Sequence, residues 1–398
     1  MKQEKLYNYI KNGWNRCIRE TKCDDGTLIG LPYPYTVPSE EAFNELYYWD
    51  TYFTNIGLLK SGRAELAKNN TDNILFLVDK YGFMPNGSRT YYLNRSQPPF
   101  LSEMVRDIYE YYKNSSWLKN AYDILKKEYE FWMSKRLTPV GLNKYDSDLS
   151  PDEVKKYADM FRKRIGIDVD IDDVSLARHG MVTAESGWDM NPRWKLDGYN
   201  YAHVDLNSLL YLFEKNMAYF SSVLKENEDE HWNVRKDKRA VLMQKYMLSS
   251  DNLYFDYNYK DNCLSDVFSV ASLYPMYAGL ATKEQAKATM ENLNRLEENY
   301  GVACCEKSDG KIKYQWDYPN GWACLQYITV KALENYGYHD KAKIIAEKYT
   351  SLVDSTFEET GSLWEKYNVV DGNIKVQNEY KMPNMLGWTA GVYIALKS

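Results

Sequence analysis

Four segments of the sequence combine aromatic rings with planar hydrogen-bonding side chains. They are residues 47–53, 86–99, 185–194 and 315–322. All four lie in expected loops or at helix starts, where functional groups concentrate. Flat rings can stack on the apolar faces of a sugar, while amide, carboxylate and guanidinium groups bond its hydroxyls. One such segment is most simply a core tryptophan beside a helix N-cap, but four in one chain favour a sugar-binding site.

Other kinds of catalytic chemistry find little support in the sequence. It contains no Gly-rich phosphate loop, and its four histidines, at 179, 203, 231 and 339, lack metal-ligand spacing. We therefore expect no metal and no cofactor. Hydrolysis would then fall to carboxylic acids, one protonated and one ionised, with pKa values separated by their surroundings. In an inverting glycosidase two such groups stand roughly 6.5–9.5 Å apart.

Charge and hydropathy narrow the range of partners. The 398 residues carry a net charge of −6, which argues against a nucleic-acid partner. The longest uncharged stretch, residues 267–282, is shorter than the ~20 residues that span a bilayer, so no membrane partner is expected. The N-terminus shows no apolar signal region, and the six cysteines fit neither a zinc site nor a small disulfide framework. These features predict a cytoplasmic protein with reduced thiols.

The dominant hydrophobic period along the chain is helical. About a dozen helices are expected, mostly in consecutive pairs, over residues 1–20, 51–60, 65–81, 99–112, 117–136, 204–225, 230–248, 273–280, 283–296, 321–336, 340–353 and 386–396. The basic run Arg162-Lys163-Arg164 looks like a solvated helix face. No Pro/Gly/Ser-rich linker divides the chain, so residues 1–398 are expected to form one all-α domain. A closed ring of helix pairs, with long loops gathered at one end, fits this pattern.

The same four segments closely resemble motifs of the trehalases, a family of glycoside hydrolases. Gln-Trp-Asp-Tyr-Pro-Asn-Gly-Trp, at residues 315–322, is nearly the second signature of that family. Tyr-Tyr-Trp-Asp-x-Tyr-Phe resembles half of the first signature, and Glu-Ser-Gly-Trp-Asp is similar to a further family segment. The order of the motifs agrees from about Phe43 to Gly391. The resemblance implies an (α/α)₆ toroid, in line with the expected ring of helix pairs.

The resemblance also implies roles for individual residues. Asp189 matches the general acid of trehalases, and Glu365, in a Glu-Lys-Tyr segment, matches the general base. Sugar-binding positions of the family match Phe43, Trp49, Asp50, Asn86, Arg95, Gln97, Gly187, Gln315 and Glu379.

Two arginines of the family pattern have no direct counterpart here. Trehalases place three arginines around the two sugars, and only Arg95 has a clear match. Ala42 stands where the first signature carries an arginine, and Ser150 lies at the nearest match to the other. Arg178 and Arg193 are candidates to compensate for this loss.

We therefore expect an inverting α-glycosidase that hydrolyses α,α-trehalose to two glucose molecules. An alternative keeps the carboxylates but takes another small α-glucoside or an α-mannoside, such as a glycosyl-glycerate. A non-catalytic sugar-binding protein is a further alternative, but retention of both Asp189 and Glu365 argues against it, because a binder needs neither an acid nor a base. The partner is expected to be a small sugar, and the protein a monomer.

Overall fold

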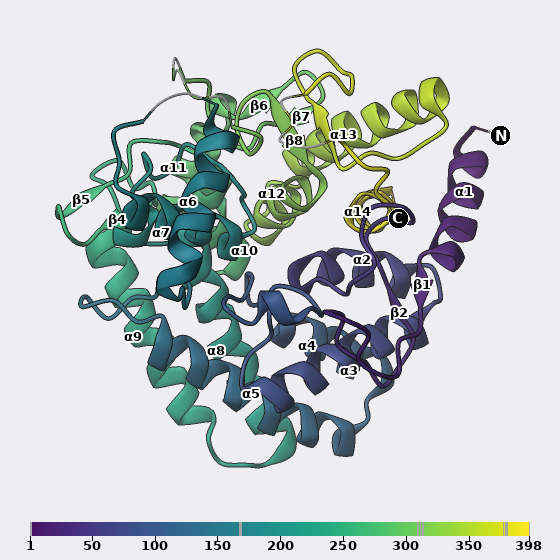
Figure 1. Cartoon of the computed structure of the whole chain (residues 1–398), viewed down its shortest axis with the longest axis horizontal. Helices are drawn as coiled ribbons and strands as arrows, with labels where there is room; N and C mark the ends of the chain where they lie inside the picture. Colours follow the sequence, from purple (N-terminus) through teal and green to yellow (C-terminus); the bar gives the residue numbers. More distant parts are fainter. Residues whose placement is uncertain are drawn as a thin grey trace.

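Helices make up most of the chain in the computed structural model, which describes residues 2–166, 169–308, 310, 312, 314–376, 378 and 381–397 (Figure 1). The α-helices are α1 (Lys2–Arg16), α2 (Tyr48–Lys60), α3 (Ala64–Tyr81), α4 (Leu101–Tyr112), α5 (Ser115–Lys135), α6 (Pro151–Ile165), α7 (Asp173–Ser186), α8 (Val204–Leu224), α9 (Asp229–Met247), α10 (Tyr274–Ala278), α11 (Lys283–Glu291), α12 (Ala323–Asn335), α13 (His339–Thr360) and α14 (Trp388–Lys397).

The strands are two or three residues long and pair only locally. They are β1 (Ile18–Arg19), β2 (Tyr35–Thr36), β3 (Tyr201–Ala202), β4 (Tyr257–Asn258), β5 (Cys263–Leu264), β6 (Glu297–Glu298), β7 (Gly301–Val302), β8 (Asn320–Trp322) and β9 (Lys366–Asn368). All pairs are antiparallel: β1 with β2, β4 with both β3 and β5, β6 with β7, and β8 with β9.

Six helices of the described chain form a closed inner ring in which each packs against the next. Its order is α2, α4, α8, α10, α12 and α14, and α14 returns to α2. Helices such as α2 and α12 are buried on almost every side, as expected for helices that are apolar nearly all round. Outer helices such as α9 bury only one stripe, which in α9 includes Arg239, and their other charged residues are exposed or partly exposed. The prediction of an all-α (α/α)₆ toroid is confirmed.

Two glycines allow the ring to close where the end of the chain meets its beginning. Figure 1 shows α14, in yellow, beside α2, in purple. A Cβ on Gly391 would lie 2.0 Å from the carbonyl oxygen of Phe53, and one on Gly57 would lie 2.4 Å from the Cα of Gly391. Any larger residue at either position would push the two helices apart. The start of α2, which carries the first aromatic segment, is thereby fixed against the C-terminal helix.

Helices α6 and α7 pack side by side in the region that the hydrophobic period did not assign to helices (Figure 1). Ser150 caps α6 in a capping box with Glu153, Pro151 occupies the first turn, and Gly166 ends the helix in the left-handed conformation. Phe161 of α6 packs over Gly180 of α7, where a Cβ would lie 2.0 Å from its ring. The pair therefore has little room to slide.

Among the described residues, no helix is both long and apolar enough to cross a bilayer.

Candidate active site

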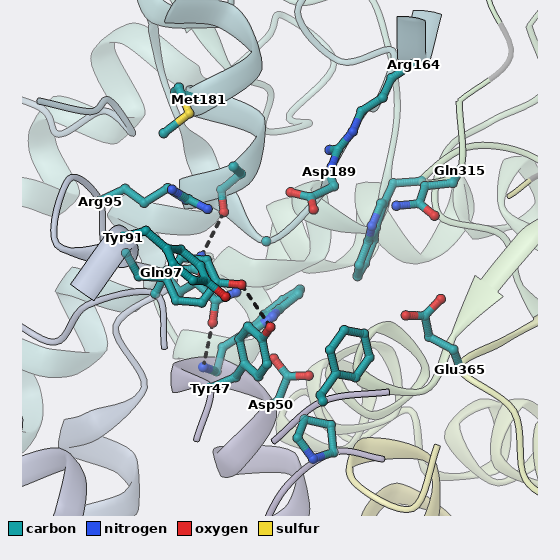
Figure 2. Close-up of a pocket in the computed structure, with 18 of the residues that line it drawn as sticks. Tyr47, Asp50, Tyr91, Arg95, Gln97, Arg164, Met181, Asp189, Gln315 and Glu365 are labelled. Carbon is teal, nitrogen blue, oxygen red and sulfur yellow. Dashed lines mark hydrogen bonds between the residues drawn. The ribbon is translucent and has the colours of Figure 1, made fainter. Parts of the chain in front are cut away.

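A cavity of about 460 Å³ brings together residues from both halves of the chain. This volume is in the usual range for small-molecule sites. Ten of the residues selected from the sequence line it: Phe43, Trp49, Asp50, Asn86, Arg95, Gln97, Gly187, Asp189, Gln315 and Glu365. Glu379 lies outside the described residues. Figure 2 shows Asp189 and Glu365 on different sides of this cavity.

The start of α2 and the segment from Asn86 to Gln97 hold each other through backbone contacts. The Trp49 N–H donates to the side-chain oxygen of Gln97 at 3.3 Å, and the Tyr48 N–H donates to the Asn86 carbonyl at 3.1 Å. The Asn86 amide donates in turn to the Ala184 carbonyl, 3.2 Å away at the end of α7. Three of the four aromatic segments are therefore joined at one end of the ring.

A sharp turn after α7 presents Asp189 to the cavity. Gly187 ends the helix with φ +74°, and a Cβ there would lie 2.6 Å from the Trp49 indole. The turn is tied down by the Ser186 hydroxyl, which accepts from the Trp188 N–H at 3.1 Å. Only glycine satisfies both the backbone angle and the contact with Trp49. Gly187 thus sets the direction in which Asp189 leaves the helix.

The surroundings of Asp189 favour its protonated form. Burial raises the pKa of this carboxyl above its ordinary value, and the charge of Glu365 acts in the same direction. The guanidinium groups of Arg164 and Arg95 oppose the shift. Figure 2 shows both arginines directed toward Asp189 from different segments. A carboxyl whose protonated form is favoured in this way is suited to donate a proton to a leaving oxygen.

Glu365 lies on a different wall and contacts a buried cation. Its Oε2 is 2.7 Å from the ammonium of Lys366, and both side chains are buried. The Trp388 indole N–H donates to the Glu365 carbonyl at 3.0 Å, which fixes the backbone here. Lys366 pairs with Trp322 across the β8–β9 ladder, and its ammonium lies 4.7 Å from the centre of that ring. Glu365 thus presents a carboxylate to the cavity, and a carboxylate can take a proton from water.

A third carboxyl, Asp50, lies in the first turn of α2. Burial raises its pKa to about 8, with smaller contributions from the charges of Glu365 and Asp189. At neutral pH Asp50 is therefore mostly neutral and acts as a hydrogen-bond donor. The cavity thus holds three carboxyls in different environments.

Stacked indoles form the aromatic wall of the cavity. Trp316 and Trp322 lie 3.7 Å apart at 5°, and Trp49 packs 5.6 Å from Trp316. Buried polar atoms beside this wall have no hydrogen-bond partner, namely the side-chain oxygen of Gln315 and the Nε of Arg95. Buried polar atoms without partners are costly unless a ligand satisfies them. A hydroxyl-rich ligand meets both requirements.

The two arginines proposed as compensating residues lie elsewhere. Arg193 is buried between Asp205 and Asp256, with contacts of 2.9 and 2.8 Å, and does not line the cavity. Arg178 contacts Asp146 at 3.1 Å, also away from the cavity. Both are used in ion pairs that stabilise the fold.

Arg164 lines the cavity instead, so its assignment to a solvated helix face was wrong. It reaches the cavity from the last turn of α6, a helix whose capping box and C-terminal glycine could have been read from the sequence. Ala42 and Ser150, at the family's other arginine positions, do not line the cavity.

A buried ion pair, which no sequence motif indicated, holds two motifs together. Glu185 receives two hydrogen bonds from Arg136, at 2.9 and 3.0 Å. The same carboxylate accepts from the backbone N–H of Ser96 at 2.8 Å, between Arg95 and Gln97. Glu185 therefore positions the arginine segment against the turn that carries Asp189.

Comparison with known proteins agrees with the sequence motifs. The family model described as Trehalase matches residues 2–397. A periplasmic trehalase of Xanthomonas axonopodis pv. citri is 34% identical over 98% of this chain and 72% of its own length. A periplasmic trehalase of Pseudomonas aeruginosa is 34% identical over 98% of this chain and 76% of its own length.

Solved structures give the same picture at the level of the fold. The neutral trehalase of Saccharomyces cerevisiae superposes with a TM-score of 0.79 at 29% identity, covering 92% of this chain and 73% of that one. A mannosylglycerate hydrolase of Thermus thermophilus has a TM-score of 0.68 at 17% identity, covering 98% and 99% of the two chains. The latter likeness shows the fold alone.

The prediction of a cytoplasmic protein is wrong, because the relatives from Xanthomonas and Pseudomonas are named periplasmic trehalases. Four of the six free thiols on which it partly rested do not report the compartment. Cys17, Cys304, Cys305 and Cys324 are buried, and burial raises the pKa of each thiol, that of Cys17 to about 11. Such thiols form little thiolate and resist oxidation wherever the protein resides.

The match over nearly the whole chain and the identity with the bacterial relatives confirm the resemblance seen in the motifs. The chain belongs to the trehalase family of glycoside hydrolases.

Proposed function

We propose that the protein hydrolyses α,α-trehalose to two molecules of glucose by a single displacement with inversion. Membership of the family implies a disaccharide as substrate. The observation that carries the proposal is the contrast between two carboxyls in one aromatic-walled cavity. Burial raises the pKa of Asp189, whereas Glu365 contacts the ammonium of Lys366.

In this mechanism Asp189 is the general acid and Glu365 the general base. Asp189 donates its proton to the oxygen that joins the two sugars, as the bond from that oxygen to the anomeric carbon breaks. Glu365 takes a proton from a water that attacks the same carbon from the opposite face. One glucose leaves with its configuration retained, and the other is released as the β-anomer.

The remaining residues of the cavity bind the sugar rings. Phe43, Trp49 and Gly187 form apolar contact surface, and hydroxyls are bonded by Asp50, Asn86, Arg95, Gln97 and Gln315. The buried side-chain oxygen of Gln315, which lacks a partner, supports this role. The described residues of a single chain enclose the cavity, and we propose that the protein acts as a monomer.

The names of the bacterial relatives support a periplasmic location for this activity.

The test is glucose release from a panel of α-linked disaccharides by the purified protein. Trehalose should be hydrolysed with the highest kcat/KM, and maltose and other 1,4- or 1,6-linked glucosides at least about tenfold more slowly. A higher kcat/KM for another disaccharide would overturn trehalose as the substrate.

A further inference from the structure

We propose that Arg164 determines specificity for the leaving sugar, so that α6 supplies a guanidinium that the family's motifs place elsewhere. The inference rests on the proposed function. Arg164 lies outside the four motifs, in a basic run whose sequence predicts a solvated helix face.

One face of α6 forms a wall of the cavity. Its members are Lys156, Tyr157, Met160, Phe161 and Arg164. Their spacing of three or four residues places them on a single side of the helix. Lys156 is exposed at one end of this face, while Arg164 at the other end is partly buried. The helix is thereby oriented with Arg164 inside the cavity.

The contact of α6 with α7 fixes how far Arg164 reaches. Phe161, one turn before Arg164, packs directly on Gly180, and both are buried. Arg162, which points away from the cavity, is held by Asp173 at 2.6 Å. These contacts anchor the last turn of α6 on both sides. Figure 2 shows the Arg164 guanidinium directed at Asp189 from this position.

Its place beside Asp189 assigns Arg164 to the leaving sugar. The general acid must reach the oxygen that joins the two sugar rings. A hydrogen-bond donor next to Asp189 therefore lies near the hydroxyls that flank that oxygen. A guanidinium offers five directed N–H donors and stays charged at every relevant pH. Lysine at this position would keep the positive charge but lose the planar arrangement of N–H donors.

Arg164 also acts on the proton of Asp189. The charged or titratable groups that face this carboxyl are Arg164 on α6, Arg95 after η1 (Thr90–Tyr92), Asp50 on α2 and Glu365 before β9. The two cations stabilise the carboxylate, while burial and the charge of Glu365 favour the protonated form. Removing Arg164 therefore raises the pKa of Asp189, and the acid stays protonated to higher pH.

The experiment compares Arg164→Met, Arg164→Lys and a matched control, Lys163→Met, which changes an exposed neighbour on the same turn. Each is assayed over pH with trehalose and with α-glucosyl fluoride, whose leaving group carries no hydroxyls. For Arg164→Met, kcat/KM for trehalose should fall by about 10- to 100-fold, as expected for one or two lost charged hydrogen bonds. The loss with the fluoride should be less than about threefold.

The pH dependence separates the two effects of Arg164. In Arg164→Met the basic limb of the trehalose profile should move to higher pH. In Arg164→Lys the limb should stay in place while KM rises. Lys163→Met should match the wild type in every respect.

Three results would overturn the proposal. They are an equal loss on both substrates, an unmoved limb in Arg164→Met, and a wild-type KM for trehalose in Arg164→Lys. If thermal unfolding shows that Arg164→Met does not fold, the KM of Arg164→Lys for trehalose is the deciding measurement.

Failure of the proposed function is a separate result, visible in the wild type as absence of trehalose hydrolysis. In that case the indoles of the cavity provide a binding signal, and glucose is titrated by tryptophan fluorescence. Arg164→Met should then bind glucose at least about fivefold more weakly than Lys163→Met. Equal affinities would overturn a role for Arg164 in sugar binding.

Discussion

Trp322 and Lys366 are cross-strand partners in the β8–β9 pair, with the ammonium of Lys366 4.7 Å from the centre of the indole. The same ammonium contacts Glu365, the residue just before it in the chain. One short pair of strands therefore fixes a carboxylate against the aromatic wall. Two motifs far apart in the sequence become parts of one site through this pairing.

Replacement of the proposed acid separates catalysis from stability. Asp189→Asn cannot donate a proton to the leaving oxygen, so kcat should fall by at least about 10²-fold. The free energy of unfolding at pH 7 should not decrease, because burial raises the pKa of Asp189 and an amide avoids the cost of a buried charge. Steady-state kinetics and urea unfolding test both points. Retention of full kcat would mean that another residue is the acid.

Replacement of the proposed base should affect both activity and stability. Glu365→Gln cannot accept a proton from water, so kcat should fall by at least about 10²-fold. It also removes a carboxylate 2.7 Å from buried Lys366, which should lower the free energy of unfolding by about 3–5 kcal/mol. Urea unfolding of the two amide variants side by side measures this contrast.

Chemical rescue distinguishes the base from the acid. Azide needs no base, and can attack the anomeric carbon in place of water while Asp189 protonates the leaving glucose. Glu365→Gln should form β-glucosyl azide and regain at least about tenfold in rate, whereas Asp189→Asn should not. Rescue of Asp189→Asn alone would reverse the two assignments.

Asp50 should be replaceable by its amide. Its carboxyl keeps a proton up to about pH 8 in the folded protein but loses it near 3.8 when unfolded. The native state thus binds more protons across this window, and stability falls as pH rises through it. Asp50→Asn should therefore increase the free energy of unfolding by at least ~1 kcal/mol at pH 8 and little at pH 4.

At pH 6 the kcat of Asp50→Asn should stay within about tenfold of the wild type, because the native carboxyl is neutral there. Asp50→Ala, which lacks the hydrogen-bonding group, is the matched comparison and should be slower than Asp50→Asn. If the difference in the free energy of unfolding between Asp50→Asn and the wild type did not change with pH, this would contradict the protonation of Asp50 in the folded protein.

Restoring the family's arginine at position 42 should not help. If Arg164 already serves the leaving sugar, Ala42→Arg should leave kcat/KM for trehalose within about twofold of the wild type, or lower it by crowding Phe43. Steady-state kinetics on trehalose measure the effect. A rise of tenfold or more, about 1.4 kcal/mol, would indicate that trehalose is not the natural substrate.

Most helices of the ring could be predicted because they are long and strongly apolar, as α2 and α12 are. The expected helix at residues 65–81 is α3 (Ala64–Tyr81) to within one residue, and that at 51–60 is α2 without its first turn. Residues 151–165 were missed because their many charges obscured the apolar stripe of Ala158, Phe161 and Ile165. Local signals, the capping box above all, were present there.

The location of the arginines could not be predicted from the sequence. Arg193 lies in one of the aromatic motif segments and Arg164 in a basic run, yet Arg193 is buried between Asp205 and Asp256 and Arg164 lines the cavity. The difference depends on how α6 packs against α7, through Phe161 and Gly180. Motif residues such as Asp189 could be identified because the residues next to them in the sequence form the motifs of the family.

The anomeric form of freshly released glucose tests the central claim, that Asp189 and Glu365 act as acid and base in a single displacement. Trehalose is hydrolysed in an NMR tube, and the anomeric protons are followed before mutarotation mixes the products. Attack by water opposite Asp189 predicts α- and β-glucose in equal initial amounts. Initial release of α-glucose alone would show retention, and would contradict the assignment of Glu365 as the base that activates water.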